Sequence, residues 1–104
     1  MSEYTLGGYM LKHDRAAAFG GSDGRAYSVA MYLDEEPDVR GLYGAALLFV
    51  RWSEGGDRPV GHLETEPLAW GRSPAEAQER LAVLSLYDVK AALEEAITRA
   101  PAEW

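Results

Sequence analysis

The segment Gly41 to Trp52, which contains the longest apolar run of the chain, predicts a strand that is covered on both sides. Side chains alternate between the two faces of a strand, so one face carries Leu42, Gly44, Ala46, Leu48, Val50 and Trp52, and the other carries Tyr43, Ala45, Leu47, Phe49 and Arg51. A strand with one wet face alternates apolar and polar residues, whereas this strand stays apolar on both faces as far as Arg51. Each face therefore needs a cover.

Three further segments are expected to form strands around it. The segment Arg25 to Leu33 alternates cleanly and predicts a strand that forms a hairpin with the central one through the acidic loop 34–41. Tyr4 to Lys12, interrupted by two glycines, suits a bulged or edge strand. Pro59 to Trp70 returns after a turn as an edge strand, or as one that ends near Thr65, because Pro67 cannot donate to a sheet.

The C-terminal third predicts helices. Ser73 is placed as an N-cap, with proline in the first turn and Glu76 able to reach back to the cap. A second capping signature begins at Ser85, so we expect two helices, with one bent helix as the alternative. Strands followed by helices indicate a single α+β domain over residues 1–104: an antiparallel sheet of three to five strands, formed as an N-terminal meander, with two C-terminal helices packed on one face.

Composition excludes several classes of function. The 104 residues include no cysteine, which excludes disulfides, thiolate metal sites and cysteine nucleophiles. The longest apolar run is about half the ~20 residues that a membrane-spanning helix needs, and the start lacks a signal-peptide pattern, so we expect a cytoplasmic protein without a membrane partner. The net charge of −7 argues against nucleic acid, and the excess of arginine over lysine suggests a bacterial source.

Residues 20–24, GGSDG, match the G-x-S-x-G pattern of a hydrolase nucleophile elbow. That motif requires a helix after the turn, whereas the residues that follow here alternate as a strand. We therefore interpret the segment as a hairpin turn. The same loop, followed by Arg25, could cradle a phosphate through its backbone N–H groups, but it lacks the lysine and the helix of a P-loop.

A second candidate is the row His62, Glu64 and Glu66, which lie on one face of the predicted edge strand. A histidine and two carboxylates could bind a divalent cation or act in acid–base chemistry. Residues in such a row are about 7 Å apart, so one ion could meet all three only with a bulge or a neighbouring strand. A solvated strand face is the simpler interpretation. His13 could add a ligand only if the first and last strands were neighbours, and no cofactor is predicted.

The strand faces give the leading functional hypothesis. We expect the helices to cover Leu48 and Val50, which would leave an apolar patch of Tyr43, Leu47 and Phe49, beside Tyr32, as a binding surface. The chain would then be a small, acidic, non-enzymatic interaction module that forms a homo-oligomer or docks onto another protein, as a regulator, inhibitor or antitoxin-like partner. In the alternative, another part of the same chain covers this apolar face, either the N-terminal segment or a sheet that closes on itself. A small-ligand or metal-binding domain that uses the His62 row is the second hypothesis.

Overall fold

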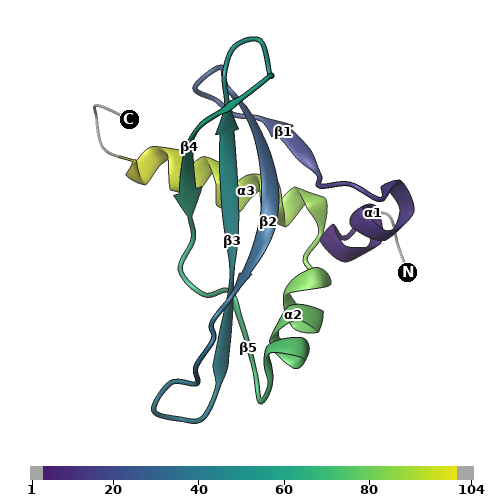
Figure 1. The fold of residues 1–104 in the computed structure, drawn as a ribbon, viewed down its shortest axis with the longest axis vertical. Coiled ribbons are helices and arrows are strands. Elements are labelled where there is room, and N and C mark those ends of the chain that lie inside the picture. Colours follow the sequence, from purple (N-terminus) through teal and green to yellow (C-terminus); the bar gives the residue numbers. More distant parts are fainter. Residues whose placement is uncertain (1–3, 101–104) are drawn as a thin grey trace.

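A computed structural model describes residues 4–100 and shows an α+β fold, as the order of predicted strands and helices indicated (Figure 1). In chain order the elements are α1 (Leu6–His13), β1 (Ala18–Gly20), β2 (Ala26–Leu33), β3 (Tyr43–Trp52), β4 (Pro59–Glu64), β5 (Ala69–Gly71), α2 (Pro74–Ala82) and α3 (Leu86–Arg99). All strand pairs are antiparallel, and β1 to β4 form a meander in sequence order. Across residues 4–100, no helix combines the length and the apolar character needed to cross a membrane.

The apolar stretch forms β3, which is the central strand of the sheet. Strand β2 pairs along most of one side of β3, while β4 and β5 share the other side. Strand β4 ends at Glu64, ahead of Pro67, as the proline predicted. The link to β5 stays attached to β3, because Thr65 N and Leu68 N donate to carbonyl oxygens of β3 at 3.0 and 2.8 Å. The three-residue strand β5 was not anticipated.

The hydrophobic core lies between one face of the sheet and the helices. It includes Tyr27, Val29, Ala45, Leu47 and Phe49 from the strands and Leu6, Ala77, Leu81, Val89 and Leu93 from the helices. Figure 1 views the molecule from the other side, so that α3 crosses behind β2, β3 and β4. The helices thus cover the face of β3 that carries Leu47 and Phe49.

This arrangement reverses our expectation that the helices cover Leu48 and Val50. The register explains the reversal, because Phe49 pairs with Val29 and Leu47 pairs with Met31. Directly paired residues share a face of the sheet, so the bulkier apolar row of β2 joins Leu47 and Phe49 against the helices. Tyr32 pairs with Ala46 instead, on the opposite face.

The N-terminal segment is a helix, so the strand predicted for residues 4–12 is wrong. Thr5 caps this helix, and its side chain accepts a hydrogen bond from Gly8 N at 3.0 Å. Leu6 is fully buried, and a Cβ on Gly7 would lie 2.8 Å from Ala82 Cβ. Gly7, the first of the two glycines that suggested a strand bulge, therefore permits a close approach between α1 and α2.

Both C-terminal helices begin where the capping signals placed them. The Ser73 hydroxyl accepts from Glu76 N at 3.1 Å, and the Ser85 hydroxyl accepts from Asp88 N at 3.0 Å. The Glu76 carboxylate reaches back to Arg72 N at 3.1 Å, one residue before the cap. Two separate helices form, and the alternative of one bent helix is excluded.

Candidate functional site

One face of the sheet has no helix on it within residues 4–100, and we call it the open face. Its residues include Ser28, Ala30 and Tyr32 of β2, Gly44, Ala46, Leu48, Val50 and Trp52 of β3, His62 and Glu64 of β4, and Trp70 of β5. The shortest extent of the molecule is 21 Å, which matches one sheet and one layer of helices at about 10 Å each. The open face is therefore one broad side of a two-layer molecule.

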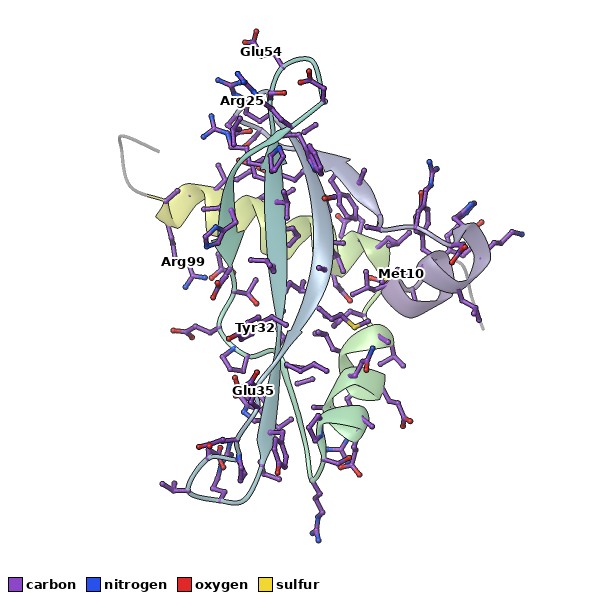
Figure 2. The ribbon with its side chains drawn as sticks, in the orientation of Figure 1. Met10, Arg25, Tyr32, Glu35, Glu54 and Arg99 are labelled. Atoms are coloured by element: carbon purple, nitrogen blue, oxygen red, sulfur yellow. The ribbon has the colours of Figure 1, made fainter. Side chains whose placement is uncertain are left out.

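The centre of the open face is apolar and slightly hollow. Tyr32 is 51% exposed, and Figure 2 labels it near the middle of the sheet. Leu48 and Val50, both partly exposed, line a hollow of about 350 Å³ together with Tyr32 and residues of β4. Small side chains surround these residues, since Ala30 pairs with Leu48 across the two strands. The result is a shallow surface that is apolar at Tyr32, Leu48 and Val50 and is bordered by His62 and Glu64 of β4.

Trp52 closes one end of the open face. Its indole Nε1 donates a hydrogen bond of 2.9 Å to the hydroxyl of Ser28 on β2. This bond satisfies the polar atom of the indole and holds the ring across two neighbouring strands. Trp52 thus offers a rigid apolar surface with its polar group already paired, which is typical of residues at protein interfaces.

The His62 row lies at the edge of the open face. His62 Nε2 is 3.8 Å from Glu64 Oε1, and both side chains are more than half exposed. Glu66 follows the end of β4, so the strand does not carry all three residues in one row. No group of three histidine or acidic side chains is placed to hold a metal ion in residues 4–100. His13 belongs to α1, at the opposite side of the molecule from β4 (Figure 1).

The predicted partner-binding residues divide between the two faces. Tyr32 lies on the open face, but Leu47 and Phe49 are 0% exposed and Tyr43 packs against the buried core from the helix side. Leu47 and Phe49 therefore form core rather than a surface that a partner could reach. The partly exposed residues that we expected the helices to cover are Leu48 and Val50.

The GGSDG segment forms the hairpin turn between β1 and β2. Gly24 has a φ of 81°, which glycine adopts without steric cost. Three backbone N–H groups of the loop already have acceptors: Gly21 donates to Arg25 O, Ser22 to Glu94 Oε2, and Gly24 to Gly21 O. A phosphate cradle would need these N–H groups to point at the ligand, so this geometry does not support one.

The acidic loop between β2 and β3 is organised by one of its own carboxylates. Asp38 accepts hydrogen bonds from the Arg40 side chain, at 2.8 Å from Nη2, and from the backbone N–H groups of Arg40 and Leu42. The Arg40 guanidinium, followed by these N–H groups, holds the pKa of Asp38 below its usual range. The Asp38 carboxylate thus stabilises the conformation of its own loop.

Comparisons of this chain with known protein families, with curated proteins and with solved structures found no match.

Proposed function

We propose that this protein is a non-enzymatic interaction module that forms a homodimer through the open face. The observation that supports the proposal is the position of Tyr32, Leu48 and Val50 as neighbours on a sheet face without a helix over it. Contiguous exposed apolar surface of this kind usually marks an interaction site. Two copies packed face to face would form four layers, with helices outside and two sheets inside.

The open face suits a second copy of the same chain. A two-fold interface must be complementary to itself, and a shallow apolar centre meets this requirement without matching charges. The charge of −7 on each copy, which includes Glu64 beside Leu48, opposes association, and salt screens this repulsion.

The test compares one substitution at two positions. Val50→Glu places a carboxylate in the centre of the open face, whereas Val39→Glu places the same group in the acidic loop, at a side chain that is 105% exposed. We expect light scattering to give a dimer mass for the wild type and for Val39→Glu, and a monomer mass for Val50→Glu. Circular dichroism checks that each variant is folded. A monomeric wild type, or a folded Val50→Glu dimer, would overturn the proposal.

Two other functions stay as predictions with less support. The net acidity favours docking onto a basic protein, and the open face would serve such a partner as well as a second copy. Binding of a divalent metal at His62, Glu64 and Glu66 receives less support, because only His62 and Glu64 lie close together. A thermal shift with divalent cations that His62→Ala abolishes would favour the metal site.

A further inference from the structure

A second hollow, separate from the open face, lies at the end of the sheet where the β1–β2 and β3–β4 turns meet. It has a volume of about 650 Å³, and we call it the hairpin hollow. Its lining consists of Arg25, Arg51, Arg58, Ser53, Glu54, Gly55, Asp57 and Val60. Figure 2 labels Arg25 and Glu54 at this end of the molecule. The hairpin hollow and the hollow on the open face share no residue.

Arginine dominates the charge of the hairpin hollow. Three guanidinium groups face two carboxylates, in a chain whose net charge is −7. One carboxylate, Asp57, accepts a hydrogen bond of 2.9 Å from the Ser53 hydroxyl inside the turn. The other, Glu54, is 90% exposed and lies 3.9 Å from Arg25, so it makes only a loose ion pair. The hollow is a local positive site on an acidic protein.

Arg58 gives this site an available guanidinium. Within residues 4–100, its side chain has neither an ion pair nor a hydrogen bond, while its backbone carbonyl accepts from Ser53 N at 2.9 Å. The backbone of Arg58 is therefore fixed by the hairpin, and its side chain is left to meet a ligand. A guanidinium presents a planar fork of N–H donors that matches the oxygens of a phosphate group in a bidentate geometry.

We propose that the hairpin hollow binds a small molecule that carries a phosphate group. The volume lies within the ~300–1,000 Å³ typical of small-ligand sites, and the polar lining suits a charged ligand. Arg25 and Arg58, which both line the hollow, would hold the phosphate through their guanidinium groups. A nucleic acid is disfavoured, because its many phosphates would meet the acidic surface beyond these arginines.

The test is a titration with pyrophosphate at low ionic strength, followed by backbone amide NMR shifts and by thermal unfolding. We expect saturable shifts at residues 53–58 and a rise in Tm with pyrophosphate concentration. Arg58→Gln should weaken binding about tenfold, as expected for the loss of a charge-assisted hydrogen bond. Arg72→Gln, which removes the same charge beside α2, should bind like the wild type. Arg58 is exposed, so its variant is expected to stay folded, and dispersed amide signals verify this.

Three results would overturn this inference. They are the absence of saturable shifts, equal binding by Arg58→Gln and the wild type, and binding of citrate as tight as that of pyrophosphate. The last result would assign the site to carboxylate ligands. The site is independent of the open face, so the Val50→Glu variant should bind pyrophosphate unchanged. Loss of binding in that variant would contradict the separation of the two sites.

Discussion

Leu47 and Leu48 are neighbours in the chain and lie in opposite environments. Leu47 is 0% exposed between the sheet and the helices, whereas Leu48 is partly exposed and lines the hollow on the open face. The two residues have identical side chains on one strand, so they compare the two faces of the sheet directly. Their difference in burial is the basis for placing the interaction surface on the side of Leu48.

Truncating each leucine to alanine should give unequal losses of stability. Leu47→Ala leaves a cavity in the core and should cost about 2–5 kcal/mol, while Leu48→Ala should cost less than about 1 kcal/mol. Urea unfolding measures both, in the Val50→Glu background so that association between copies does not contribute. Equal losses would mean that both faces of β3 are covered within one chain.

Gly71 should not tolerate a larger side chain. It is buried at the end of β5, where a Cβ would lie 2.5 Å from Ala77 N in the first turns of α2. We expect Gly71→Ala to destabilise the protein by about 1–3 kcal/mol, because backbone atoms must move to make room. The matched control is Gly20→Ala in β1, where a Cβ would meet no atom within 4 Å, and its unfolding curve should stay within about 0.5 kcal/mol of the wild type.

Stability should fall in acid partly through Glu94. Its carboxylate accepts from Lys90 Nζ at 2.6 Å and from Ser22 N at 3.1 Å, and these bonds, that from Lys90 first, hold its pKa below the ordinary value of 4.5. A lowered pKa in the folded state stabilises the protein above about pH 4.5, and this stabilisation is lost as the pH falls through the folded-state value.

The Glu94→Gln variant should therefore lose stability at pH 7 and show a weaker dependence on pH below about 4.5. Urea unfolding across this range measures both effects. Glu95→Gln is the control, since that carboxylate is 70% exposed and 4.0 Å from its nearest cation, Arg99. If Glu94→Gln and Glu95→Gln gave the same profile, the bonds to Lys90 and Ser22 would have no energetic role.

The N-cap of α2 should contribute measurably to folding. Replacing Ser73 with alanine removes the acceptor for Glu76 N and should cost about 1 kcal/mol. Ser73→Asp keeps an acceptor at the same position and should restore most of that loss. Thermal unfolding compares the two variants, and equal destabilisation would point to a lost packing contact instead of the cap.

Local signals in the sequence predicted most of the elements. The capping serines located both C-terminal helices, and the alternation in residues 26–33 located β2, because these patterns depend only on nearby residues. The N-terminal helix was not predicted because Gly7 and Gly8 disfavour helix. The glycine at position 7 is explained only by the close contact with Ala82, which the sequence alone does not reveal. The short strand β5 forms through its pairing with β3, a contact that its own three residues do not specify.

The assignment of faces failed for a different reason. The two rows of β3 are almost equally apolar, so this strand alone does not indicate which row faces the helices. Strand β2 carried a usable signal, since the row of Tyr27, Val29 and Met31 is bulkier than the row of Ser28 and Ala30. The register between β2 and β3 decides which row of β2 shares a face with which row of β3. This register is set by the 34–44 connection, where Asp34 N donates to Gly44 O at 2.9 Å. Of the four predicted partner-binding residues, only Tyr32 lies on the open face.

The β1–β2 turn and α3 are far apart in the chain and are joined by side-chain bonds. Ser22 N donates to Glu94 across 72 residues, and Lys90 donates to Gly20 O across 70 residues. Contacts of such separation require most of the chain to be ordered before they form, so they raise the contact order and slow folding. They also join the first hairpin to the last helix, so hydrogen exchange should show both segments opening together as one cooperative unit.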